Sequence, residues 1–228
     1  MMKMEQGTFF QLSFFLLLIV ATVSAMPQDC TEIEQNNQNA TSGLHVIQPE
    51  GSPLLVVNCV MRNNDSWTVI QRNTRSSRIT WTESWTTYKY GFGDVLGDHW
   101  LGNEYIYYLT RQTRYKLRIE FTDYRRAIKY AEYDSFYIEP ENRKYAIRLG
   151  IFSGNVFDRL TQLSPNVLID NQPFTTMDRD NDNSGINCAS GRGGWWFNAC
   201  GNVYLNSNYP YWPGVSIREV TMMIQPTC

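Results

Sequence analysis

A short segment in the middle of the chain alternates strictly between apolar and charged side chains. Residues 115–121 read Tyr-Lys-Leu-Arg-Ile-Glu-Phe, so every second side chain is apolar. Successive side chains of a β-strand point to opposite faces, and this pattern therefore places all the apolar side chains on one face. The segment is the clearest strand of the sequence, and it predicts a sheet with one face packed on a core.

Further strands and two short helices are predicted from apolar runs bounded by turn-forming residues. The expected strands cover Leu54–Asn58, Trp67–Gln71, Ala131–Ile138, Tyr145–Ile151 and Ile217–Ile224. The expected helices cover Trp81–Tyr90, which stops at a Gly-Phe-Gly sequence, and Asn103–Thr110. Between residues 164 and 213 regular periodicity disappears, but tryptophans and cysteines persist, so we expect an ordered loop region that carries function.

The N-terminal segment has the pattern of a secretory signal peptide. Lys3 supplies a weak positive charge, an apolar run follows at Phe14–Val20, and small residues lead to Ala25. The run is too short to cross a bilayer, and no second run of spanning length follows, so we expect no membrane span. We expect residues 1–25 to be removed, residues 26–228 to form one domain, and the mature protein to be secreted to the extracellular space.

The composition argues against two classes of function. The chain has 20 Lys and Arg against 22 Asp and Glu, a net charge of −2, so bulk attraction to nucleic acid is not indicated. Its two histidines, His45 and His99, have no Ser, Cys or carboxylate constellation near them in the sequence, so we expect no enzyme.

The cysteines and two sequence triplets fit an oxidising, secretory compartment. An odd number of cysteines leaves one over when the others pair. The cysteines are Cys30, Cys59, Cys188, Cys200 and Cys228. Asn-x-Ser/Thr triplets at Asn39 and Asn64 predict N-linked glycosylation.

Three carboxylates at alternate positions lie in the loop region. Residues 178–185 read Asp-Arg-Asp-Asn-Asp-Asn-Ser-Gly. Ca²⁺ takes about six to eight oxygen ligands, and a divalent ion holds together carboxylates that otherwise repel one another. An EF-hand loop starting at Asp178 would need Gly and Glu where this chain has Asn183 and Ala189. The carboxylates alone therefore fit a calcium site and a solvated acidic turn equally well.

A longer pattern of tryptophans, glycines and cysteines surrounds these carboxylates. Its parts are Asp29-Cys30, Trp67–Arg72, Trp85-x-x-Tyr88-x-x-Gly91-Phe92-Gly93, Trp100–Glu104, Asp180-Asn181-Asp182, Asn187-Cys188, Gly193-Gly194-Trp195-Trp196-x-Asn198-x-Cys200 and Met222-x-Ile224-x-Pro226. In this order the chain resembles the fibrinogen-like (fibrinogen C-terminal) domain family, which includes ficolins, tachylectins, angiopoietins, angiopoietin-like proteins and the fibrinogen chains. The resemblance implies an α+β fold with a central twisted antiparallel sheet, two flanking helices and a loop-rich, calcium-binding C-terminal region.

The resemblance also implies a calcium site and a disulfide pattern. Asp180 and Asp182 would bind Ca²⁺ together with backbone carbonyls near Ser184 and Ile186, whereas Asp178 would be a nearby charge. The disulfides would be Cys30–Cys59 and Cys188–Cys200. Cys228 lies past the usual end of the family and would stay unpaired or join two chains as a homodimer.

Sugar-binding members of the family hold their ligand at a strained turn. By resemblance, the Ala199–Cys200 peptide bond would be cis, and the N–H groups of Cys200 and Gly201 would face an acetyl or carboxylate oxygen of the ligand. Tyr209 and Tyr211 are the available pocket aromatics. Many members have His where this chain has Gly201, and the segment after Asn206 is short, so acetyl-group specificity does not follow from the resemblance. We expect Trp195 and Trp196 to support the turn from the core.

Two main functions stay open at this point, and the first of them is the favoured one. The first is a calcium-dependent recognition protein that binds glycans or acetylated surface groups, as innate-immune lectins do. The alternative is a secreted, angiopoietin-like protein ligand of a cell-surface receptor, and a matrix-associated structural protein is a weaker third. The missing His and the short pocket segment favour the receptor ligand.

The fate of Cys228 yields a first testable prediction. An unpaired cysteine next to the chain end is well placed for a bond between two chains. Non-reducing electrophoresis should show a dimer that reductant converts to monomer and that Cys228→Ser abolishes. A monomer with an alkylatable thiol at Cys228 would contradict the covalent dimer.

Overall fold

The computed structural model describes residues 25–62, 64–76, 78–161, 168–201 and 203–227. The expected signal peptide, except for Ala25, and Cys228 lie outside the described residues. Within the described ranges, no helix is long and apolar enough to cross a membrane.

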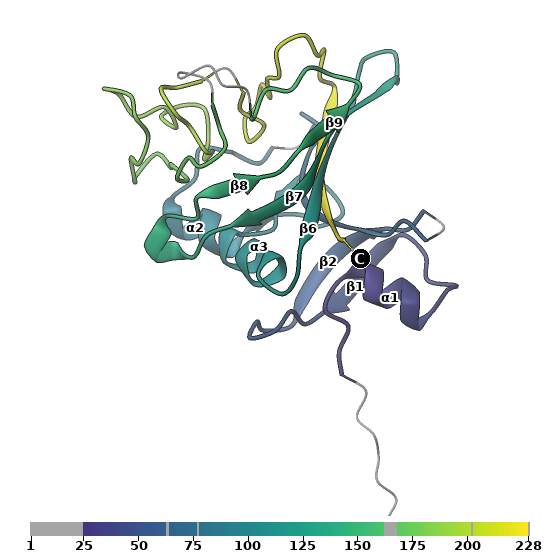
Figure 1. Cartoon of the computed structure of the whole chain (residues 1–228). Coiled ribbons are helices and arrows are strands. Elements are labelled where there is room, and N and C mark those ends of the chain that lie inside the picture. Colours follow the sequence, from purple (N-terminus) through teal and green to yellow (C-terminus); the bar gives the residue numbers. More distant parts are fainter. Residues whose placement is uncertain (1–24, 63, 77, 162–167, 202, 228) are drawn as a thin grey trace, which may run out of the picture.

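The centre of the fold is a twisted antiparallel sheet, as Figure 1 shows, and the predicted α+β class is confirmed. Its main strands run in the order β1-β2-β3-β10-β6-β7-β8. Their bounds are β1 Gly43–Ile47, β2 Leu55–Val60, β3 Trp67–Asn73, β6 Tyr115–Thr122, β7 Ile128–Ile138, β8 Ile147–Leu149 and β10 Glu219–Pro226. Short strands extend it: β9 Phe152–Gly154 pairs with β7, and β5 His99–Trp100 pairs with β3 and with β4 Phe92–Gly93.

The C-terminal strand β10 lies between β3 and β6, so the last segment of the chain completes the middle of the sheet. Met222 pairs with Ile119 of β6 and with Gln71 of β3. The alternation predicted for β6 is confirmed, because its apolar side chains are buried and its charged ones are partly exposed. The charged face carries ion pairs from Arg118 to Glu120 and Glu132.

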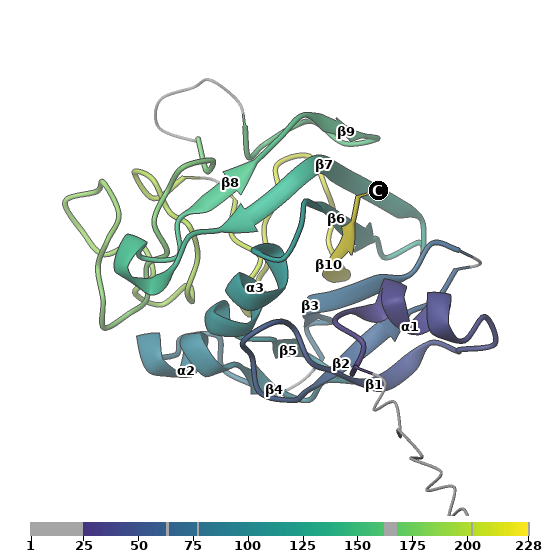
Figure 2. The same ribbon diagram turned by 60° about the horizontal axis from the view of Figure 1, so that its bottom comes forward.

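In the part of the chain that the structure describes, three short α-helices accompany the sheet (Figure 2). The predicted helix α3 spans Asn103–Thr110, and α2 spans Trp85–Tyr90, four residues shorter at its start than predicted. A 3₁₀ turn covers Glu141–Arg143. The helix α1, Cys30–Asn36, was not predicted; Asp29 caps it by accepting hydrogen bonds from the amides of Thr31 and Glu32 at 2.8 and 2.9 Å.

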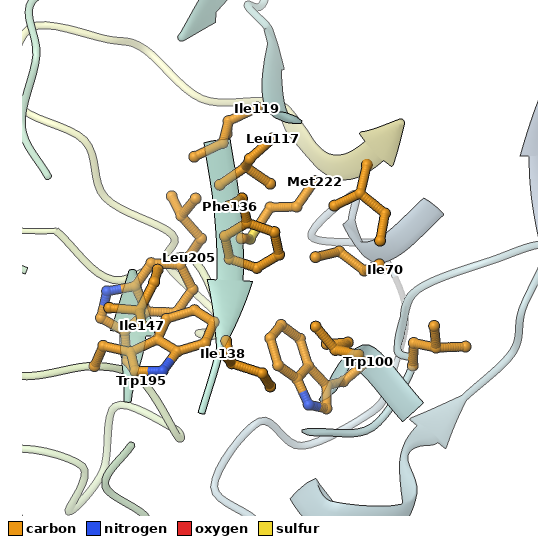
Figure 3. Close-up of a cluster of buried hydrophobic side chains, with 14 of the residues drawn as sticks. Ile70, Trp100, Leu117, Ile119, Phe136, Ile138, Ile147, Trp195, Leu205 and Met222 are labelled. Carbon is orange, nitrogen blue, oxygen red and sulfur yellow. The ribbon is translucent and has the colours of Figure 1, made fainter. Parts of the chain in front are cut away.

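The loop region between β9 and β10 packs aromatic side chains into the core. Figure 3 shows Trp195 and Leu205 of this region close to Ile138 and Ile147 of the sheet. Phe174 lies at the centre of an aromatic cluster, with its ring centroid 5.2 Å from both Tyr88 and Trp196. Such ring pairs add about 0.5–1.5 kcal/mol each beyond the area they bury. The loops are therefore anchored by burial, although they contain little regular structure.

Removing the Phe174 ring should destabilise the whole domain. Phe174 is fully buried, so Phe174→Ala leaves a cavity and should lower the free energy of unfolding by about 3–5 kcal/mol in urea denaturation. Phe157 is 74% exposed, and Phe157→Ala is the matched control that should change stability by no more than about 0.5 kcal/mol. Equal effects of the two changes would show that the cluster does not anchor the loops.

Candidate functional site

The candidate site is the part of the loop region that the Cys188–Cys200 disulfide and the bridge between Thr175 and Trp195 hold together. Both predicted disulfides are confirmed: Cys30–Cys59 joins α1 to β2, and Cys188–Cys200 joins the acidic loop to the turn that follows Trp196. An antiparallel bridge between Thr175 and Trp195 ties the same two loops together a second time. The acidic loop and the turn at Cys200 therefore form one unit.

Trp195 and Trp196 support this unit from below, as predicted. Both side chains are fully buried, and the indole N–H of Trp196 donates to the carbonyl of Tyr145 at 2.8 Å. The preceding Gly194 has no space for a side chain, because an added Cβ would lie 2.6 Å from the ring of Tyr88. The tryptophan pair therefore packs in the core beneath the site and is not exposed to a ligand.

The carboxylate of Asp178 is hydrogen-bonded to the start of helix α2. Its carboxylate accepts a hydrogen bond from the backbone N–H of Trp85 at 2.8 Å and another from the hydroxyl of Thr176 at 2.8 Å. The first of these satisfies an amide that the first turn of α2 leaves without a partner inside the helix. Asp178 therefore links the acidic loop to α2, which fits its expected place outside the calcium shell.

Asp180 and Asp182 lie next to each other at the tip of the acidic loop. Asp182 accepts hydrogen bonds from the backbone N–H groups of Ser184 and Cys188, each at 2.9 Å. Burial raises the pKa of Asp182, and the neighbouring Asp180 carboxylate raises it as well, although the two amide hydrogen bonds act in the opposite direction. The two adjacent carboxylates fit a cation, because a bound positive charge removes the repulsion that contributes to the raised pKa of Asp182.

The remaining ligands of such an ion would have to be neutral oxygens. No group of three or more His, Cys, Asp or Glu side chains in the described ranges could hold a metal ion. Ser184 is partly exposed, and the side chain of Ile186 is 72% exposed. Backbone carbonyls at these positions and water fit the oxygen preference of Ca²⁺.

The turn at Cys200 differs from the expectation in one respect. The Ala199–Cys200 bond was predicted to be cis, but none of the described peptide bonds is cis. The chain turns instead through two successive left-handed residues, Cys200 with φ 56° and Gly201 with φ 31°. Left-handed backbone at two residues reverses the chain direction with ordinary trans peptide bonds. Gly201 is suited to this conformation because it has no Cβ.

Tyr209 and Tyr211 occupy different surroundings. Tyr209 is 73% exposed and lines a hollow of about 200 Å³ together with Arg75 and Trp81, and this lining does not include Ala199, Cys200 or Gly201. Tyr211 pairs with Tyr204 through backbone hydrogen bonds and through rings whose centroids are 5.7 Å apart. The structure therefore places Tyr211 against Tyr204 and places Tyr209 in the hollow beside Arg75.

Arg192 is a residue of this site that the sequence analysis missed. Its guanidinium donates to the carbonyl of Cys200 at 3.2 Å and lies 5.2 Å from the ring centroid of Tyr204. The side chain thus connects the Cys200 turn to the tyrosine pair. A single Arg between glycines carries no sequence signal of such a role.

Comparison with known proteins assigns the family. The sequence matches the family described as fibrinogen beta and gamma chains, C-terminal globular domain, over residues 26–226, so the chain belongs to this family. A chicken (Gallus gallus) protein described as fibrinogen-like protein 1-like protein is 47% identical over 205 residues, 88% of this chain and 72% of that protein. Human (Homo sapiens) angiopoietin-related protein 2 is 38% identical over 220 residues, 87% of this chain and 43% of that protein. The chain thus spans less than half of this angiopoietin-related relative.

Solved structures agree with this assignment. The fibrinogen-like globe domain of human ANGPTL2 superposes with a TM-score of 0.79 at 35% identity, over 89% of this chain and all of that chain. A lamprey fibrin D-dimer, solved with the peptide ligand Gly-His-Arg-Pro-amide, has a TM-score of 0.80 at 28% identity, over 89% of this chain and 74% of that chain.

Mutation of Asp178 can separate the contact of the acidic loop with α2 from the expected calcium binding of the same loop. Asp178→Ala removes the acceptor at the start of α2 and should lower the free energy of unfolding by about 1 kcal/mol, measured in urea. Asp178→Asn keeps a side-chain oxygen and should lose less. Neither change should alter calcium uptake in calorimetry; a loss of uptake in Asp178→Asn would instead place Asp178 in the metal shell.

Proposed function

We propose that this chain is a secreted protein ligand that binds a cell-surface receptor protein through its loop region. The contact surface, called here the loop face, consists of Met177, Ile186, Arg192, Tyr204 and Tyr211. The proposal assigns the chain a binding role and no catalytic one. The observation that carries it is the exposure of large apolar side chains on this face.

The exposed side chains have the composition of a protein interface. Met177 is 50% exposed, Ile186 72% and Tyr211 44%. Tyrosine, methionine and arginine are enriched where proteins bind proteins, and a few such residues supply most of the binding energy. Exposed apolar residues that lie together among polar ones mark protein interaction sites, which is why their connection on this face matters.

The loop face is one connected surface. The amide of Asn187 donates to the carbonyl of Met177 at 3.3 Å, which holds Met177 beside the segment of Ile186. The adjacent Cys188 is bonded to Cys200, whose carbonyl accepts from Arg192. Arg192 in turn covers Tyr204, which packs on Tyr211. These contacts fix the residues of the loop face relative to one another, so a receptor would bind a preformed surface.

The relatives support a protein ligand more than a lectin. Angiopoietin-related protein 2 and angiopoietin-4, both human, are 38% and 36% identical to this chain. Glycan or acetyl-group binding at Ala199, Cys200 and Gly201 stays the other outcome of the test, with Tyr209 and Tyr211 as its aromatic residues. The lectin hypothesis is weakened because this chain has Gly201 where many members of the family have His.

Calcium belongs to the proposal as a structural ion. Asp180 and Asp182 would hold it, with carbonyl oxygens near Ser184 and Ile186, and it would neutralise the acidic loop that carries Ile186. The ion would stiffen the loop face and take no part in a reaction. Any binding to the native state alone stabilises the domain, by about 2.7 kcal/mol when the free ion is at 100 times its Kd.

Binding to receptor-bearing cells tests the loop face directly. The double change Ile186→Asp, Tyr211→Ala should reduce binding of labelled protein by at least about tenfold, because it removes two exposed anchors. Leu54→Asp is the matched control, since Leu54 is 59% exposed on the hairpin of β1 and β2 and should leave binding unchanged. Inhibition of wild-type binding by N-acetyl sugars would favour the lectin.

The calcium proposal predicts a definite dependence on pH. Asp180→Ala, Asp182→Ala should abolish calcium uptake and leave the central sheet folded, measured by calorimetry and circular dichroism. Because the pKa of Asp182 is raised in the folded state, the ionised carboxylate opposes folding above that pKa, and this effect disappears as the pH falls through it. Ca²⁺ binds the ionised form, so the rise in Tm that calcium causes should shrink over the same fall in pH. A calcium effect that is independent of pH in this range would argue against these ligands.

A further inference from the structure

The two Asn-x-Ser/Thr triplets lie at the far end of the sheet from the loop face, on either side of the hairpin of β1 and β2 (Figure 1). Asn39 lies between α1 and β1, and Asn64 lies between β2 and β3. Gly43 of β1 pairs with Cys59 of β2, so both asparagines project from the same end of the hairpin.

The surroundings of the two asparagines show that they share one surface. A hollow of about 370 Å³ is lined by Gln38 and Ala40, which flank Asn39, and by Asn64 itself. Both asparagines are exposed, and within the described ranges neither side-chain amide makes a hydrogen bond. The backbone N–H groups alone are bound, to Asn37 Oδ1 at 3.1 Å for Asn39 and to Glu34 Oε1 at 3.0 Å for Asn64. A group attached to either side chain would therefore displace no contact.

The same hairpin carries the free edge of the sheet. β1 is the terminal strand of the order, so no strand of the described residues pairs with the backbone groups on its outer side. Leu44 and Val46 of β1 are 50% and 43% exposed, and Val56, which pairs with Val46, is 50% exposed. An exposed apolar edge strand is a template for pairing with another chain unless something covers it.

We propose that Asn39 and Asn64 both carry N-linked glycans, and that the two glycans together cover this end of the domain and shield the edge strand β1. In the attachment step, the asparagine side-chain nitrogen displaces the diphosphate of a lipid-diphosphate-linked oligosaccharide. The C–O bond to the diphosphate breaks, a C–N bond forms, and the amide nitrogen loses a proton. The proposal rests on the secretory destination included in the proposed function, and it leaves the loop face as the surface free for a partner.

The two acceptor sites differ in one way that sets the order of events. Thr41, the hydroxyl residue of the first triplet, is exposed in the folded domain. Ser66, the hydroxyl residue of the second, is only 1% exposed and donates to Glu34 Oε2 at 2.6 Å. The second triplet is therefore accessible to the transferase only before the turn between β2 and β3 folds. Occupancy at Asn64 should accordingly be lower than at Asn39.

The test is the mass of the full chain secreted by animal cells, before and after treatment with peptide-N-glycosidase F. Two glycans should be removed. Thr41→Ala and Asn64→Asp should each lose one, whereas Thr41→Ser should keep both. Asn64 has φ 66°, a left-handed conformation that Asp also tolerates, so Asn64→Asp should still fold. Secreted protein without glycans would overturn this proposal alone; protein retained in the cytosol would overturn the secretory destination and this proposal with it.

The shielding of β1 by the glycans can be measured separately, as self-association of the protein. Enzymatic removal of the glycans from folded protein should leave its Tm nearly unchanged but increase self-association at least twofold in light scattering. Val46→Lys places a charge on the edge strand and should reverse that increase. Deglycosylated protein that associates no more than the glycosylated form would show that the glycans do not shield β1.

Discussion

The insertion of β10 between β3 and β6 is the constraint on which the rest of the structure depends. Glu219–Pro226 pairs with β6 along its whole length and with β3 through a register that shifts between Met222 and Met223. Neither half of the sheet is complete until this last segment has been placed. The two ends of the loop region, at β9 and β10, are thereby fixed to neighbouring parts of the same sheet.

That arrangement explains how a long stretch with little regular structure can present a defined surface. Its backbone is positioned by the strands at both ends, by the Cys188–Cys200 disulfide and by the burial of Phe174, Trp195 and Trp196. Burial of large aromatic side chains supplies the free energy that helices and strands supply elsewhere. The residues left outside, such as Ile186 and Tyr211, are consequently held on a firm support, which lowers the entropic cost of binding a partner.

The fold was largely predictable because its strongest signals are local. Alternation placed β6 within one residue of its observed end, and an apolar run bounded by turn-forming residues gave the bounds of α3. The helix α1 and the strand β1 were missed, because their stability comes from distant contacts: Cys30 is bonded to Cys59, and β1 exists only as the partner of β2. Segments as short as these carry almost no periodic pattern.

The site was predictable in its residue types but not in its geometry. The resemblance gave both disulfides correctly, whereas the backbone at Cys200 and the role of Arg192 depend on how distant loops meet. The separation of Tyr209 from Tyr211 has the same origin, since one contacts the Arg75 hollow and the other packs on Tyr204. Spacing along the sequence does not encode such contacts.

The most direct test of the account is site-specific photocrosslinking on receptor-bearing cells. A photoreactive side chain placed at position 186 of the full chain should crosslink to a membrane protein, and the same group at position 54, on the β1–β2 hairpin, should not. Crosslinking from position 54 alone would contradict the loop face as the binding surface.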